Sequence, residues 1–131
     1  MTKNAARVFL VFVGLAYVAL GIWCAAAPAT TSKSVGFDLQ PGQGQSEFLT
    51  VYGGLEVGLG LLFLRPLYKR EEIDAPLIAC VTIHACLVLF RSIAFFTFSN
   101  FPTTTYLLAA TEWTIFLGAA VLCWLRRANP E

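Results

Sequence analysis

The sequence has few charged residues for its length. Only 13% of the 131 residues are Asp, Glu, Lys or Arg, whereas 57% are hydrophobic and the mean hydropathy is +0.69. A soluble domain of this size has about 25% charged and about 45 to 50% apolar residues, so it has no interior large enough to hold the excess. The composition therefore excludes a soluble enzyme and a disordered tail. A net charge of +1 without a basic stripe also excludes a nucleic-acid partner.

The common motifs of catalysis and metal binding are also missing. The four cysteines form no CxxC or Cys/His pattern with zinc spacing, and all of them lie in apolar runs, where we expect them to pack as small hydrophobic side chains. There is no phosphate-binding glycine loop and no nucleophile elbow. The sequence therefore predicts no metal and no cofactor, and it identifies no catalytic residue.

What the sequence has instead is four long apolar runs. They lie at about 7–27, 48–64, 76–98 and 103–125. A bilayer offers no water to the backbone and the runs lack the alternation of barrel strands, so each run should be a helix. We predict an all-α integral membrane protein, a four-helix bundle with one membrane domain at 1–131 and a flexible outer loop at 28–47.

The basic residues predict the orientation of these helices. Of the nine Lys and Arg residues, seven flank the spans on one side, and only Lys33 lies in the opposite loops. The positive-inside rule then places both termini in the cytoplasm of a multi-pass membrane protein, with membrane lipid around it. The first apolar run is too long for an ordinary signal peptide, and Pro28 disfavours cleavage after it, so we expect it to remain as a helix.

Four ionisable side chains lie inside the spans: Glu56, His84, Arg91 and Glu112. A charge at the bilayer centre costs about 2.5 to 3.5 kcal/mol on insertion scales, so these groups should face one another rather than lipid. Counted at about 1.5 Å per helical residue, the depth below the outer membrane surface is roughly 10 to 15 Å for Glu56, Arg91 and Glu112. His84 shares a face with Arg91, about 10 Å away along the axis. We predict an ionic cluster on three helices, with Tyr52 beside Glu56.

The charge balance of this cluster leaves several interpretations open. Two carboxylates and one guanidinium are together negative when all are ionised, which is costly in a low dielectric. Either one glutamate stays protonated, or His84 takes a proton, or a cation or cationic ligand occupies the site. Alternatively, the cluster is architectural and only fixes which helices pack together.

Small residues mark faces on which helices can approach closely or leave room for a ligand. Two such stripes are Gly14, Tyr17, Gly21 and Cys24 on the first span, and Tyr52, Gly53, Glu56 and Gly60 on the second. Gly54 and Gly58 form a GxxxG pair directed away from Glu56. This pair either packs against a neighbouring helix of the same chain or forms a homodimer contact.

The second span reads EFLTVYGGLEVGLG at 47–60, the third contains Arg91-Ser92, and the fourth contains Glu112. With these features the chain resembles, over about residues 5–125, an uncharacterised bacterial family of small four-helix membrane proteins. This family is a domain of unknown function with a Tyr-Gly-Gly motif, distantly similar to the DoxX-like group. The resemblance implies an inner-membrane helix bundle and makes Arg91 and Glu112 family features, whereas family members often have another residue in place of Glu56.

These observations favour a protein that binds a small amphipathic or lipid-like ligand between its helices over an enzyme. Arg91 would hold a polar or anionic head group, and Glu112 and Glu56 would orient Arg91 and exchange a proton. One alternative is an intramembrane enzyme that transfers a proton on a lipid-like substrate, with His84 and Glu112 as acid and base. Another is an accessory subunit of a membrane redox complex, since DoxX-like relatives serve quinone-linked systems.

Overall fold

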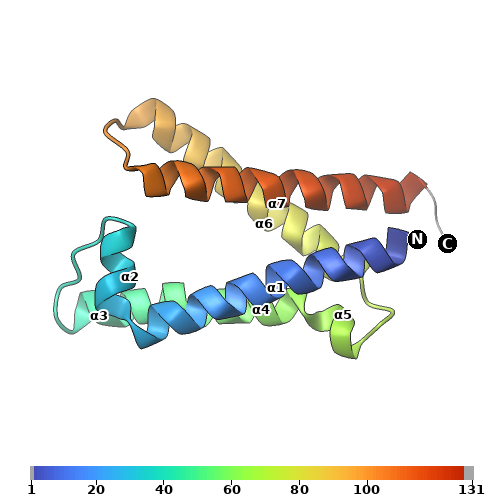
Figure 1. The fold of residues 1–131 in the computed structure, drawn as a ribbon, viewed down its shortest axis with the longest axis horizontal. Coiled ribbons are helices and arrows are strands. Elements are labelled where there is room, and N and C mark those ends of the chain that lie inside the picture. The colour runs from blue at the N-terminus through green and yellow to red at the C-terminus, as the bar shows by residue number, and fades with distance from the viewer. Residues whose placement is uncertain (1, 129–131) are drawn as a thin grey trace. The chain divides into compact units, whose positions relative to one another are not determined.

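The computed structural model describes residues 2–128, and every regular element in this range is a helix. The predicted all-α fold class is therefore confirmed. Four helices are long and apolar enough to cross a membrane, and each of the four predicted runs falls on one of them (Figure 1). They are α1 (Thr2–Ala26), the composite helix Gln43–Tyr68, α6 (Asp74–Thr97) and α7 (Thr103–Ala128).

The second of these helices is not uniform. It contains, in order, α3 (Gln43–Phe48), the π-helix η1 (Leu49–Leu55), α4 (Glu56–Phe63) and α5 (Arg65–Tyr68). The Tyr-Gly-Gly element lies inside η1, where two adjacent glycines remove the side chains that would fix a regular α-helical path. Helical turns of this wide type are rare and often occur at functional sites. The sequence analysis predicted a plain helix here.

The connection at 28–47 is more regular than predicted. It contains α2 (Pro28–Ser34), which begins with Pro28 at a position where the missing N–H group is not needed. The Thr31 hydroxyl donates to the Ala27 carbonyl at 2.9 Å across the first turn of α2. Gly36 and Gly42 then adopt positive φ angles of 84° and 78°, which reverse the chain before α3. The predicted outer loop is therefore partly helical.

The described helices belong to two compact units. Unit 1 contains Met1–Leu10 and Arg65–Glu131, and unit 2 contains Val11–Leu64. Within unit 1, α6 and α7 form a helical hairpin through the turn at 98–102, where Asn100 has a φ of 65° (Figure 1). The start of α1 packs on this hairpin, because a Cβ atom on Gly118 would lie only 2.8 Å from the Phe9 ring.

Unit 2 is built on glycine contacts between α1 and the second span. A Cβ atom on Gly21 would lie 2.8 Å from the Gly53 carbonyl oxygen, and one on Gly14 would lie 2.9 Å from the Gly60 carbonyl oxygen. The two backbones therefore touch at two levels. The small-residue stripes were predicted either to let helices approach closely or to leave room for a ligand. Close approach is confirmed at Gly14, Gly21, Gly53 and Gly60.

The outer faces of the long helices are apolar. In the most apolar stretch of each helix, only 11% to 28% of the residues are buried within the protein. Phe12, Phe90 and Phe96, for example, are 74%, 69% and 93% exposed. Surfaces of this extent and character are stable against lipid rather than water. The chain is therefore a small multi-pass membrane protein.

Candidate functional site

Arg91 on α6 and Glu112 on α7 form a bidentate ion pair within unit 1. The Arg91 Nε donates to Glu112 Oε2 at 3.1 Å, and the Arg91 Nη2 donates to Glu112 Oε1 at 2.6 Å. The side chains are 28% and 13% exposed, respectively. Two parallel, charge-assisted hydrogen bonds fix the plane of the guanidinium as well as its distance. The sequence analysis predicted this contact from the need to pair charges inside a span.

Small and medium-sized side chains around the pair allow α6 and α7 to approach each other. Ala109 and Ala119, which lie on the same stripe of α7 as Glu112, are 7% and 0% exposed. On α6, Val88 is buried one turn before Arg91, and the Ser92 hydroxyl donates to the Val88 carbonyl at 2.7 Å. This packing holds the backbones at the separation that the long Arg91 side chain spans.

His84 lies on α6, seven residues before Arg91, and is 1% exposed. Its Nδ1 lies 2.9 Å from the Cys80 carbonyl oxygen. A carbonyl only accepts hydrogen bonds, so Nδ1 carries the hydrogen and the ring is oriented by its own helix. Because α6 is continuous, His84 and Arg91 are about 10 Å apart along the axis, as predicted.

Glu56 and Tyr52 belong to unit 2. Glu56 is the first residue of α4, directly after the π-helix, and its Oε2 atom is buried without a hydrogen-bond partner among residues 2–128. The Tyr52 ring stacks on Phe48 at a centroid distance of 4.7 Å and meets Phe37 edge-on at 5.7 Å. The participation of Glu56 in one layer with Arg91 stays a prediction.

Gly54 and Gly58 differ from the glycines at the α1 contact. A Cβ atom on either residue would have no neighbour within 4 Å. Neither glycine therefore makes the predicted close contact with a neighbouring helix of its own unit. Within the second span, Gly53 and Gly60 make that contact instead. The homodimer contact at the Gly54 and Gly58 face stays a prediction.

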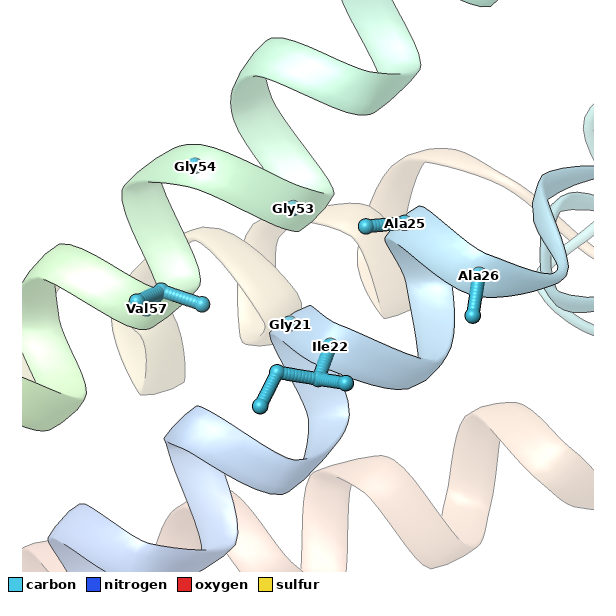
Figure 2. A pocket seen from close by; sticks show the side chains of 7 residues that line it. All are labelled: Gly21, Ile22, Ala25, Ala26, Gly53, Gly54 and Val57. Atoms are coloured by element: carbon cyan, nitrogen blue, oxygen red, sulfur yellow. The ribbon is translucent and has the colours of Figure 1, made fainter.

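An open groove of about 540 Å³ lies beside the Gly21 and Gly53 contact (Figure 2). Figure 2 shows that glycine, alanine and aliphatic side chains of α1, η1 and α4 line it. These residues are Gly21, Ile22, Ala25, Ala26, Gly53, Gly54 and Val57. The lining offers van der Waals contact only, so the groove provides none of the charged groups predicted for the ligand site.

The other polar groups of the described residues do not form a metal centre. Among residues 2–128, no three His, Cys, Asp or Glu side chains converge in a way that could hold a metal ion. The four cysteines are free thiols, of which Cys24 and Cys80 are buried and Cys86 is exposed. The Arg91–Glu112 pair is therefore the candidate site that the geometry supports best.

The family described as a domain of unknown function, DUF4345, matches residues 5–125. The chain belongs to the DUF4345 family. No curated protein and no solved structure matches the chain. The matched residues are the same ones over which the sequence resembles a domain of unknown function, so this resemblance is confirmed. A relationship of this DUF4345 chain to the DoxX-like group, and the Tyr-Gly-Gly motif as a family feature, stay predictions.

Arg91 of this DUF4345 chain carries a group that can donate several hydrogen bonds. A guanidinium stays protonated in proteins and offers N–H groups in a planar fork, which fits a carboxylate, phosphate or sulfate head group. Glu112 is a fixed acceptor that orients the fork. Sequence reasoning found both residues but missed the Cys80 carbonyl that orients His84, although the spacing of four residues on one helix indicates such a contact.

Proposed function

We propose that the chain binds a small amphipathic or lipid-like molecule in the bacterial inner membrane, with Arg91 holding its anionic or polar head group. Glu112 positions Arg91 for this contact. The observation that carries the proposal is the bidentate pair inside two span helices, in which 28% of the Arg91 side chain remains exposed while Glu112 is more deeply covered. The described residues thus leave part of the Arg91 side chain uncovered, which gives a head group a place to approach the pair.

The charge of the pair supports an anionic head group. Glu112 neutralises Arg91, so the pair carries no net charge and the span can remain in the membrane. When an anionic head group approaches, the Arg91 guanidinium can share its N–H donors between Glu112 and the head group. A proton bound by Glu112 or by the head group would then restore neutrality. The roles of His84, Glu56 and Tyr52 in ligand binding stay predictions.

The architectural interpretation makes a different prediction for the same residues. Removing only one partner of a partly buried pair leaves the other charge unpaired and costs about 3 to 5 kcal/mol of stability, whereas replacing both partners by neutral groups costs much less. The variant Arg91→Gln/Glu112→Gln therefore keeps the helices together while removing the guanidinium. The variant Glu112→Gln keeps the guanidinium and loses only the positioning carboxylate.

The test is native mass spectrometry of protein gently extracted from membranes, with thermal unfolding measured on the same samples. We expect the wild type to carry a bound small molecule and the folded double variant to retain at least about tenfold less of it, as expected for the loss of a charge-assisted hydrogen bond. Glu112→Gln should retain the molecule more weakly than the wild type. A folded double variant that keeps the full amount, or a wild type without any bound molecule, would contradict the proposal.

Neither alternative function has a specific structural observation in its favour. The intramembrane-enzyme hypothesis requires the His84 ring to reach a substrate, and that ring is 1% exposed with Nδ1 already committed to the Cys80 carbonyl. The accessory-subunit hypothesis predicts that larger proteins copurify with the chain. If the wild type carried a protein partner but no small molecule, the accessory role would replace the ligand-binding proposal.

A further inference from the structure

One end of unit 1 carries most of the positive charge of the chain. The segments 3–7, 65–74 and 126–127 contain seven Lys and Arg residues but only three carboxylates. Hydrogen bonds and ion pairs hold these segments together, so the charges are concentrated rather than spread along the helices. The start of α1, the linker between α5 and α6, and the end of α7 all contribute to this end of unit 1.

Each of the three carboxylates already has a cationic partner. The pairs are Lys3–Glu71 at 3.1 Å, Lys69–Glu72 at 3.2 Å, Arg65–Glu72, and Arg126–Asp74 at 2.7 Å. Within residues 2–128, the other three cations of this end have no carboxylate partner: Arg7, Arg70 and Arg127. The charge of these three arginines is therefore not balanced by the three carboxylates.

The position of Arg7 is fixed by a neutral acceptor. Its Nη2 donates to the backbone carbonyl oxygen of Arg70 at 3.0 Å, and its Nε is buried without an acceptor in the described part of the chain. One helical turn earlier, Lys3 bonds to Glu71 and holds α1 against the same linker. The protein thus holds a guanidinium beside Arg70 without supplying an anion for it.

Two exposed aromatic side chains indicate that this end lies at a membrane boundary. Tyr68 in α5 and Trp124 near the end of α7 are 67% and 68% exposed. Tyr and Trp are enriched at the interface between hydrocarbon and water, which is the level of the lipid head groups. An anion that meets Arg7 and Arg70 at this level is most readily supplied by a lipid.

We propose that Arg7 and Arg70 bind the phosphate group of an anionic phospholipid. Arginine binds phosphate through charge-assisted, bidentate hydrogen bonds, and basic residues next to membrane helices attract anionic lipids. The site is separate from the Arg91–Glu112 pair, since Arg91 lies about 25 Å of helix beyond Asp74 at the start of α6. It goes beyond the proposed function, because it concerns the bilayer and not the ligand of the spans.

The experiment uses full-length protein that has been delipidated in detergent and then titrated with phosphatidylglycerol or phosphatidylcholine, with bound lipid counted by native mass spectrometry. The central variant is Arg70→Gln, because Arg7 uses the Arg70 backbone carbonyl, which this change retains. The matched control is Lys69→Gln, which removes one positive charge from the same linker but at a residue paired with Glu72. Arg7→Gln provides an independent second change.

We expect the wild type to prefer phosphatidylglycerol, and Arg70→Gln and Arg7→Gln each to weaken its binding about tenfold. Lys69→Gln and the double variant Arg91→Gln/Glu112→Gln should change it less than twofold. The last comparison separates this site from the ligand site, so either proposal can fail alone. An equal loss in Lys69→Gln would show a general charge effect, and displacement of the lipid by millimolar inorganic phosphate would show a site for free phosphate. Either result, or unchanged binding in both arginine variants, would overturn the proposal.

Discussion

Gly14 and Gly60 bring the backbones of α1 and α4 into direct contact. A Cβ atom on Gly60 would lie 2.8 Å from the Gly14 carbonyl oxygen, and one on Gly14 would lie 2.9 Å from the Gly60 carbonyl oxygen. The contact is therefore reciprocal. In lipid, helices gain little from burying apolar side chains, so close backbone packing of this kind is a principal source of association within unit 2.

The first prediction compares two glycines of the same helix. Gly60→Ala places a methyl group against the α1 backbone and should lower the free energy of unfolding by about 1 to 3 kcal/mol. Gly58→Ala meets no atom within 4 Å and should be neutral or stabilising by up to about 1 kcal/mol, since alanine favours a helix over glycine. Titration of the folded protein in micelles with a denaturing detergent measures both values. Equal effects of the two changes would contradict the packing described for unit 2.

The second prediction concerns acid stability at the linker between α5 and α6. The Arg65 guanidinium, and then the Lys69 ammonium, bond to Glu72 and hold the pKa of this carboxyl below its usual range. Because the folded pKa is lower than the unfolded one, the stabilisation is complete above the ordinary glutamate pKa of about 4.3 and is lost as the pH falls through the folded value. Glu72→Gln should therefore be less stable than the wild type near neutral pH and equal to it in strong acid.

Unfolding curves of both proteins across this pH range measure the difference. The effect should be small, because the Glu72 side chain is 39% exposed and water screens the pair. In an Arg65→Gln background the pH dependence should shrink further, since the main cause of the pKa shift is then removed. A stability difference that grows toward acid pH would have the wrong sign for this account.

The third prediction is the orientation in the membrane. In a cysteine-free background, Gln45→Cys and Ser99→Cys should react in intact cells with a maleimide that does not cross the inner membrane. Arg127→Cys should react only after permeabilisation, because the positive-inside rule keeps the basic helix ends in the cytoplasm. All three side chains are exposed, so access to the reagent depends on the side of the membrane and not on burial. The reverse labelling pattern would show an inverted topology.

The pairing of Arg91 with Glu112 follows from the sequence alone. An isolated charge in lipid is costly, so few arrangements of the ionisable side chains inside the spans are possible. The depth of each side chain in the membrane, counted at a fixed rise per helical residue, selects among these arrangements. The shared face of His84 and Arg91 was predicted from their spacing of seven residues, which lies within the continuous helix α6. Hydropathy located the four helices for a similar reason, because a bilayer imposes both their length and their hydrogen bonding.

Finer features of unit 2 could not be predicted in this way. A GxxxG pair indicates a packing face, yet a Cβ atom on Gly54 or Gly58 would meet nothing within 4 Å, and only the predicted stripe with Gly53 and Gly60 brings glycines against α1. The π-helix at Leu49–Leu55 changes the angle between the residues before and after it. A helical wheel drawn for a regular α-helix therefore does not give the relative directions of the Tyr52 and Glu56 side chains. Helix α2 was missed because it has only seven residues and most of them are Thr, Ser or Pro, which have low helix propensity.

The division of the chain into units sets an order for its assembly. Unit 2 is one continuous stretch, Val11–Leu64, so all of its contacts are available once that stretch has left the ribosome. Unit 1 joins Met1–Leu10 to Arg65–Glu131, and its contacts between Lys3 and Glu71 and between Phe9 and Gly118 link residues that are far apart in the sequence. The contact between Phe9 and Gly118 can therefore form only after α7 has been synthesised, later than the contacts within unit 2.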